Sequence, residues 1–181
     1  MQTFPVGILH KQATDRGLRF MVIGGHAVNA YLEPRVTLDV DFMICADDRD
    51  VWLELIQNEG FRIVNDGGNF LQFDPPCGIQ WRLDLMIVGA KSFETLNAAA
   101  NEVSCLGIPA KVPREQDLIA MKLHALHHGP PERRLKDLPD IVGLMNRLNW
   151  TVESAELAAL LEKYGTPELR DAILTLHKKP E

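Results

Sequence analysis

Residues 21–44, MVIGGHAVNAYLEPRVTLDVDFMI, decide how the chain folds. The stretch begins with the short apolar run 21–23, which predicts a strand, and the pair Gly24-Gly25 interrupts it. Residues 26–32 then suit a short helix that Pro34 ends, because proline lacks the N–H donor that a helix needs. The stretch therefore predicts a strand, a glycine turn, a short helix, a loop and a second strand.

Two carboxylates are neighbours on the second strand. Asp39 and Asp41 alternate with apolar residues, and side chains two residues apart on a strand point to the same face. Leu38, Val40 and Phe42 form the expected buried face. Like charges at this spacing raise each other's pKa unless a cation lies between them, and Mg²⁺ is the usual cation for such oxygen ligands. The pattern indicates either a metal clamp or a solvent-facing acidic strand after an ordinary glycine turn.

The glycine pair suits an anion. Gly24 and Gly25 open the predicted short helix, where backbone N–H groups and the positive end of the helix dipole favour a negative charge. A binding site for phosphates beside a carboxylate clamp for a metal is the combination that nucleoside triphosphate chemistry requires. Together the two features predict a nucleotide site.

The order of these residues resembles the first motif of the nucleotidyltransferase superfamily, which has the DNA polymerase beta-like fold. The matching positions are an apolar strand, a helix and the residues Gly24, Gly25, Arg35, Thr37, Asp39 and Asp41. Within the superfamily the pattern is most similar to the minimal nucleotidyltransferases and to the AbiEii-like toxin nucleotidyltransferases. The resemblance covers about residues 18–142.

The resemblance implies transfer of a nucleoside monophosphate from a nucleoside triphosphate (NTP) to an acceptor hydroxyl. Asp39 and Asp41 would hold one or two Mg²⁺ ions that bridge the triphosphate. Gly24 and Gly25 would bind the phosphates. Arg35 and Thr37 would complete the nucleotide site, and Arg35 has a second possible role, which is to pair with an aspartate and fix the loop.

Asp84 is the third carboxylate of interest. It lies inside the apolar run 81–88, WRLDLMIV, where strand propensity disfavours aspartate, so its carboxylate needs a partner. Arg82 is one candidate, because it lies on the same face of the predicted strand. The resemblance implies another role, in which Asp84 on a neighbouring strand is a third metal ligand or the base that accepts the proton of the attacking hydroxyl.

The remaining pattern predicts an α+β fold with a C-terminal helical subdomain. We expect a nucleotidyltransferase core at residues 1–112, with a mixed, mostly antiparallel sheet flanked by helices, and a helical subdomain at 113–181 that packs on the core. The expected helices are 5–16, 26–32, 47–59, 91–100, 114–128, one that begins at Asp137, 152–164, and 167–177 with Thr166 as its N-cap. The expected strands are 19–23, 37–44, 61–64, 69–74, 79–88 and one or two within 103–112.

Lys122 lies in the middle of the apolar stripe of helix 114–128, beside Leu118 and Ile119. A lysine on a buried face needs an anion to offset its desolvation. A triphosphate or a carboxylate of the sheet would supply one. The alternative is that the side chain extends past the stripe to water.

Three histidines of the same helix suggest a metal site at first sight. His124, His127 and His128 lie on the face away from Lys122. A solvated polar face therefore explains them better than a metal site.

The segment 117–141 resembles a later motif of the AbiEii-like proteins, with a helix that has a central lysine, a basic turn, and Lys136-Asp137 at the start of another helix. This resemblance implies that Lys122 binds phosphate and that Asp137 is a site residue. Because Pro139 follows closely, Asp137 has a second possible role as a helix N-cap. Arg133, Arg134 and Lys136 form either part of a cleft for tRNA or a solvated turn.

Composition narrows the class of protein. The chain has 181 residues and a net charge of −6 without a long basic run, which argues against broad electrostatic capture of nucleic acid. Cys45, Cys77 and Cys105 are isolated, as in reduced cytosolic proteins. The chain begins without an apolar leader, and no apolar run approaches about 18 residues, so we expect a cytoplasmic protein without membrane partners.

The expected partners are an NTP and an acceptor on tRNA, protein or a small molecule, with a cognate antitoxin as a further candidate. Two alternatives stay open at this point. One is a nucleotide-binding regulator of the same fold without turnover. The other is a toxin–antitoxin or defence component that acts by protein contact.

Overall fold

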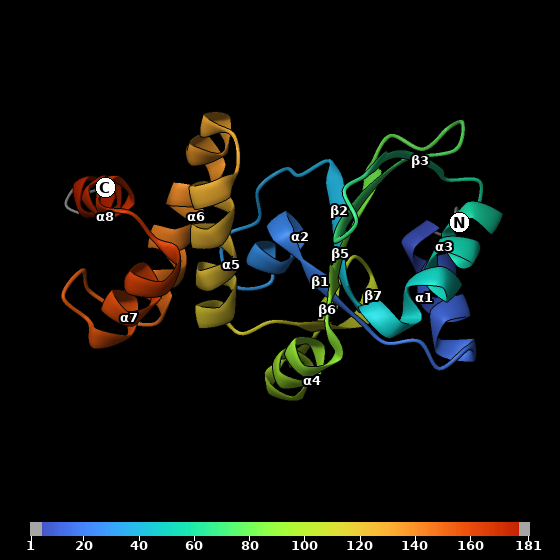
Figure 1. Ribbon diagram of the computed structural model, residues 1–181, viewed down its shortest axis with the longest axis horizontal. Coiled ribbons are helices and arrows are strands. Elements are labelled where there is room, and N and C mark those ends of the chain that lie inside the picture. Colours follow the sequence, from blue (N-terminus) through green and yellow to red (C-terminus); the bar gives the residue numbers. More distant parts are fainter. Residues whose placement is uncertain (1–4, 178–181) are drawn as a thin grey trace. The chain divides into compact units, whose positions relative to one another are not determined.

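A computed structural model describes residues 5–177, which form two compact units that divide between Pro113 and Arg114 (Figure 1). The first unit combines helices with a mixed sheet, and the second is helical, so the predicted α+β class is confirmed. The first unit contains α1 (Pro5–Asp15), β1 (Phe20–Ile23), α2 (Gly24–Asn29), β2 (Asp39–Cys45), η1 (Ala46–Asp48), α3 (Arg49–Asn58), β3 (Arg62–Asp66), β4 (Phe70–Asp74), β5 (Arg82–Val88), α4 (Ala90–Ala99), β6 (Asn101–Cys105) and β7 (Ile108–Val112). The second contains α5 (Glu115–His128), η2 (Pro131–Arg133), α6 (Arg134–Arg147), α7 (Ala155–Tyr164) and α8 (Pro167–His177). No helix in this part of the chain is long and apolar enough to cross a membrane.

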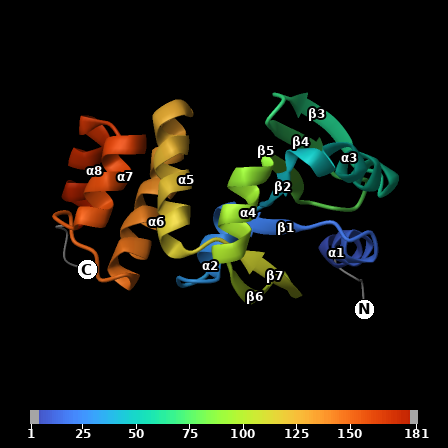
Figure 2. The same ribbon diagram turned by 60° about the horizontal axis from the view of Figure 1, so that its bottom comes forward.

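The sheet of the first unit has the strand order β3-β4-β5-β2-β1-β7-β6. Its pairs β3/β4, β4/β5, β2/β1 and β7/β6 are antiparallel, whereas β5/β2 and β1/β7 are parallel. The prediction of a mixed, mostly antiparallel sheet is therefore confirmed for residues 5–177. Figure 2 shows β3 at one edge of the sheet and β6 at the other.

One face of the sheet is covered by α1 and α3 (Figure 1). Phe42 of β2 and Trp52 of α3 are fully buried there. The ring of Phe20 lies 4.6 Å from that of Phe42 and 5.5 Å from that of Trp52, measured between centroids. This apolar layer fixes which face of β2 is buried, and the alternation of the strand then directs Asp39 and Asp41 to the opposite face.

Strand β2 begins later than predicted. The expectation that Leu38 belongs to the buried face is wrong, because β2 starts at Asp39 and Leu38 is 66% exposed. The reason lies in Asn29 at the end of α2. Its amide donates to the carbonyl of Arg35 at 2.8 Å and accepts from the N–H of Arg35 at 3.1 Å, so the preceding loop is tied to the helix rather than to the sheet.

In the second unit α5 packs against α6, α7 and α8. The predicted N-cap of the last helix is confirmed, since the N–H of Leu169 donates to Oγ1 of Thr166 at 3.3 Å. Helix α7 begins at Ala155, later than predicted, because the N–H of Thr151 donates to Oγ of Ser154 at 2.8 Å and holds a turn there.

The N-cap alternative for Asp137 is wrong. Helix α6 begins at Arg134, directly after the short turn η2, so Asp137 lies inside the helix and is 1% exposed. Pro139 also lies inside α6 and removes one helical donor, whose acceptor would be the carbonyl of Leu135. Leu135 is 85% exposed, and water can reach that end of the helix.

Candidate active site

Asp41 and Asp84 face each other across two central strands. Strands β2 and β5 are parallel, and their register pairs Asp41 with Asp84, so both side chains project from the same face of the sheet. Asp84 is 7% exposed, and Asp41 is half-buried. The structure thus brings together two of the three carboxylates that the sequence singled out.

Gln72 extends this row on the other side of Asp84. It is the register partner of Asp84 on β4, and its Nε2 donates to Oδ2 of Asp84 at 3.2 Å. The donated hydrogen bond restricts the rotation of the Asp84 carboxylate. Sequence reasoning missed Gln72, although its position as the central polar residue of FLQFD in β4 was a usable signal.

Asp39 lies one step further along the same face. Its register partner is Arg82, and the ion pair that Arg82 forms in the described part of the chain is with Asp74, with Nε 3.3 Å from Oδ1. The structure therefore pairs Arg82 with Asp74 rather than with Asp84. Asp39 is half-buried and follows the exposed loop end at Leu38.

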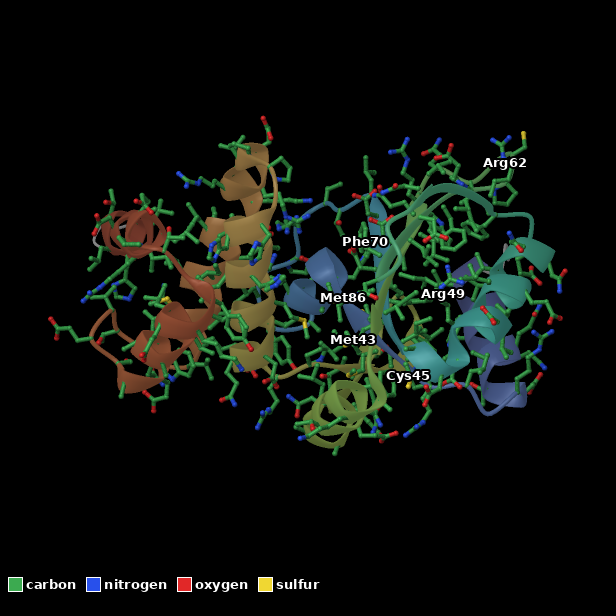
Figure 3. All side chains as sticks on the ribbon, viewed as in Figure 1. Met43, Cys45, Arg49, Arg62, Phe70 and Met86 are labelled. Carbon is green, nitrogen blue, oxygen red and sulfur yellow. The ribbon has the colours of Figure 1, made fainter. Side chains whose placement is uncertain are left out.

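An apolar row borders the carboxylate pair on its other side. Phe70, Met86 and Met43 are in register across β4, β5 and β2, on the same face as Asp84 and Asp41. Figure 3 labels these three side chains along the side of the sheet where α2 lies, with Arg49 and Arg62 beyond the opposite side. The row forms an apolar border along one edge of the carboxylate pair.

Gly24 makes room for Asp41. It has φ +65°, a left-handed conformation that glycine adopts without strain, and a Cβ atom at this residue would lie 2.1 Å from Oδ2 of Asp41. No other residue type fits unless the carboxylate moves. The position of the Asp41 carboxylate therefore depends on glycine at residue 24.

Gly25 has the same relation to Thr37. A Cβ atom at Gly25 would lie 2.8 Å from Oγ1 of Thr37, so the hydroxyl lies against the start of α2. The clamp by Asn29 on the backbone of Arg35 holds this loop in place. Sequence reasoning missed Asn29. The tendency of asparagine to hydrogen-bond nearby backbone groups could have indicated its role in the loop.

His26 follows the glycine pair and is half-buried. Burial lowers the pKa of its imidazole from the ordinary value of 6.5, and the positive charge of Arg35 lowers this pKa further. Both effects favour the neutral form of the imidazole at the start of α2.

Lys122 of the second unit is buried with two carboxylates of α6. Its Nζ lies 2.7 Å from Oδ1 of Asp137 and 2.8 Å from Oδ2 of Asp140, and Nε of Arg133 lies 3.0 Å from Oδ2 of Asp137. The alternative in which Lys122 extends to water is wrong, because the residue is 7% exposed. These carboxylates are the anionic partners that were expected for a buried lysine. Phosphate binding by Lys122 and a site role for Asp137 stay predictions.

The three histidines of α5 are exposed, as predicted for a polar outer face. The rings of His127 and His128 stack at 4.4 Å, and Nδ1 of His127 lies 3.2 Å from the carbonyl oxygen of Tyr164. Desolvation lowers the pKa of His128, with smaller contributions from the charges of His127 and His124. The cluster joins α5 to the end of α7.

The similarity of this chain to known proteins lies in its three-dimensional structure. No model of a known protein family and no curated protein matches this chain. The solution structure of the antibiotic-resistance factor ANT(2'')-Ia is similar with a TM-score of 0.67 and 16% identity, over 95% of this chain and 94% of that chain. The chain has the nucleotidyltransferase fold.

Two further structures with the nucleotidyltransferase fold are similar. The lincosamide antibiotic adenylyltransferase LnuA matches with a TM-score of 0.57 and 12% identity, over 78% of this chain and 95% of that chain. A nucleotidyltransferase-like protein from Paracoccidioides brasiliensis matches with a TM-score of 0.52 and 20% identity, over 92% and 88%. The superfamily fold expected from the sequence is confirmed, and the narrower resemblance to AbiEii-like toxins stays a prediction.

The donor set of this nucleotidyltransferase fold suits Mg²⁺. Asp41 and Asp84 offer two carboxylates on one face, and Mg²⁺ in nucleotide sites is commonly held by one or two carboxylates together with waters and substrate phosphates. Across residues 5–177 no group of three or more His, Cys, Asp or Glu residues is arranged to hold a metal ion. Binding of Mg²⁺ therefore relies on the pair, with Asp39 as the nearest further carboxylate on that face, and it stays a prediction.

Proposed function

We propose that this chain is a Mg²⁺-dependent nucleotidyltransferase that moves a nucleoside monophosphate from an NTP to an acceptor hydroxyl. The observation that supports this proposal best is the register pair of Asp41 and Asp84, with Asp41 packed against Gly24. The two carboxylates lie beside the Gly24-Gly25 turn in a chain with the nucleotidyltransferase fold, where they can bind a metal ion together.

Each residue of the site has a role in the proposal. Asp41 and Asp84, assisted by Asp39, hold the metal, which supplies positive charge at the phosphates when it is bound. Gly24 and Gly25 offer backbone N–H groups to the triphosphate. The acceptor oxygen attacks the α-phosphorus. The bond between the α-phosphorus and the oxygen that bridges to the β-phosphorus breaks, and pyrophosphate leaves.

The proton of the acceptor hydroxyl goes to a carboxylate in this proposal. Asp84 is the better candidate, because it is buried beside an apolar row and is oriented by Gln72. Thr37 and Arg35 line the start of the site from the loop that Asn29 fixes. Phosphate binding by Lys122 and a site role for Asp137 remain separate predictions, because the two side chains form a buried ion pair with each other.

The acceptor that we propose is a small hydroxyl-bearing molecule. One structure of ANT(2'')-Ia, at a TM-score of 0.67 and 17% identity, contains adenylyl-2"-tobramycin, and it is matched over 96% of its length by 88% of this chain. The match over most of both chains supports the proposal of a small-molecule acceptor. Its net charge of −6 also favours a cationic or neutral acceptor over polyanionic RNA.

The test is a transfer assay with each α-labelled NTP, Mg²⁺, and a panel of aminoglycosides, lincosamides, tRNA and protein. We expect label on a small molecule, and loss of at least about a hundredfold in rate for Asp41→Asn or Asp84→Asn. Asp50→Asn is the matched control, because Asp50 is an exposed carboxylate of α3. Transfer that persists in both site variants would contradict the proposal, and NTP binding without transfer would favour the non-catalytic regulator.

A further inference from the structure

The row of side chains that contains Asp41 and Asp84 continues across β4 to the edge strand β3. Gln72 of β4 is the register partner of Asp84, and Asn65 of β3 is the register partner of Gln72. Nδ2 of Asn65 donates to Oε1 of Gln72 at 3.3 Å, and Nε2 of Gln72 donates to Oδ2 of Asp84 at 3.2 Å. Two amides thus form a hydrogen-bonded chain that ends on the Asp84 carboxylate.

An irregularity in β3 places Asn65 at the end of this row. Ile63 pairs with Phe73, and the register then shifts, so that Asn65 rather than Val64 lies opposite Gln72. Register shifts of this kind are common next to active sites, where they redirect a side chain. The shift therefore gives Gln72 an amide as its neighbour in place of an apolar side chain.

Two apolar side chains lie beside the row. Phe70 and Met86 are register partners on β4 and β5, and alternation along the strands places them on the same face as Asp84. Both are half-buried, whereas Leu71 and Leu85, which point to the opposite face, are fully buried. An aromatic ring and a thioether thus reach the surface beside the carboxylate. A thioether side chain is flexible and adapts to ligands of different shape.

The strand order places these side chains on one side of the carboxylate pair and the glycine turn on the other. Gly24 follows Ile23, which is the register partner of Asp41 on β1, whereas β4 lies beyond Asp84. The attacking and leaving oxygens of phosphoryl transfer are roughly in line. If the leaving pyrophosphate is bound at the glycine turn, a hydroxyl that gives its proton to Asp84 enters from the side of β4.

The charges on this side do not suit a polycation. Asp74 is the carboxylate of β4, and it forms an ion pair with Arg82, with Nε 3.3 Å from Oδ1. The amides of Asn65 and Gln72 are uncharged, and Asp84 is assigned to the metal and the proton. An acceptor with several ammonium groups therefore has few carboxylates to pair with here, whereas a neutral acceptor with an apolar group finds both polar and apolar partners.

We propose that Asn65, Phe70, Gln72 and Met86 form the acceptor subsite, and that the acceptor is a neutral molecule with an apolar ring or alkyl group next to the reacting hydroxyl. This inference rests on the proposed nucleotidyl transfer and specifies its substrate. The apolar group lies on Phe70 and Met86, which brings the hydroxyl to Asp84. Asn65 holds Gln72 in place and offers its amide oxygen to a polar group of the acceptor.

The test measures transfer from α-labelled NTPs with Mg²⁺ to methyl, butyl and hexyl β-glucoside and to tobramycin. We expect kcat/KM for the acceptor to rise at least about tenfold from the methyl to the hexyl glucoside, because apolar surface leaves water. Tobramycin should be a poorer acceptor than the hexyl glucoside. Phe70→Ala and Met86→Ala should each reduce the preference for the hexyl glucoside without changing KM for NTP, and Phe70→Leu should retain most of it. Val51→Ala is the control, because Val51 is an exposed apolar residue of α3.

Equal kcat/KM for the three glucosides, or an unchanged preference in both alanine variants, would overturn this inference and leave the proposed transfer intact. Faster transfer to tobramycin than to any glucoside would overturn it too. A titration of the ¹⁵N-labelled chain with hexyl glucoside separates the subsite from the reaction. Shifts at Phe70, Gln72 and Met86 without transfer would support the subsite and contradict the transferase, and the absence of such shifts would overturn the subsite. Urea unfolding of each variant excludes loss of the fold as the cause.

Discussion

The present position of the Asp41 carboxylate requires glycine at residue 24, because a Cβ atom on residue 24 would lie 2.1 Å from Oδ2 of Asp41. Gly24→Ala should therefore displace the carboxylate and abolish Mg²⁺-NTP binding. Gly17→Ala separates this effect from backbone strain, since Gly17 has a similar φ of +68° and open space around it. Both variants should lose about 1–2 kcal/mol of unfolding free energy through strain, measured by urea titration. Calorimetry that finds equal NTP affinity in the two variants would show that the contact is unimportant.

Gln72 is expected to act through Asp84. Gln72→Ala removes the donor 3.2 Å from Oδ2 of Asp84 and frees this carboxylate to rotate. We expect kcat of nucleotidyl transfer to fall about tenfold with little change in KM for NTP, because one oriented hydrogen bond is lost at the reacting end. Gln57→Ala, on the exposed surface of α3, serves as the control. An unchanged kcat in Gln72→Ala would remove Gln72 from the site.

Lys122 should be a main determinant of stability in the second unit. Lys122→Met takes the shared cation from Asp137 and Asp140, which are 1% and 4% exposed. Breaking a buried ion pair from one side typically costs about 3–5 kcal/mol, which urea unfolding would measure. Adding Asp140→Asn should restore part of the loss, and the exposed Lys136→Met should cost little. A loss below about 1 kcal/mol in Lys122→Met would contradict this account.

His26 should make the fold sensitive to acid. Burial and Arg35 lower its pKa below the ordinary value of 6.5, so the unfolded chain binds a proton more readily than the folded chain. Protonation of His26 therefore lowers the free energy of unfolding as the pH drops below about 6.5. Above that pH, His26 makes no pH-dependent contribution to the free energy of unfolding. Urea titrations from about pH 7.5 to about pH 5.5 should show a smaller decrease for His26→Gln than for the wild type. Parallel pH curves for the two proteins would refute this role.

Local chemistry in the sequence was sufficient to predict most elements of the first unit. Gly17 and Gly60 end helices with positive φ, and the alternation around Asp84 identified β5. Register was not predictable in the same way. The family resemblance implied that Asp84 lies on a strand next to that of Asp39 and Asp41. The register itself, in which Asp84 faces Asp41 and Asp39 faces Arg82, depends on the packing of whole strands and could not be predicted from local sequence.

The second unit shows the same limit for side-chain partners. The position of Lys122 on the apolar stripe predicted an anionic partner, but the sequence was compatible with several such partners. Asp137 and Asp140 are three residues apart and therefore share one face of α6. This spacing was a signal for their joint role, and it was obscured by Pro139, which favoured a helix that starts at Asp137.

The parallel pairing of β2 with β5 has a consequence for how the chain reaches its native state. Parallel neighbours need a long crossover, and here α3 and the β3–β4 hairpin lie between the two strands in sequence. Contacts of such high sequence separation form slowly, because the intervening chain must be ordered first. We therefore expect Asp41 and Asp84 to meet late in refolding, so that ligand-binding competence is acquired after most of the secondary structure has formed.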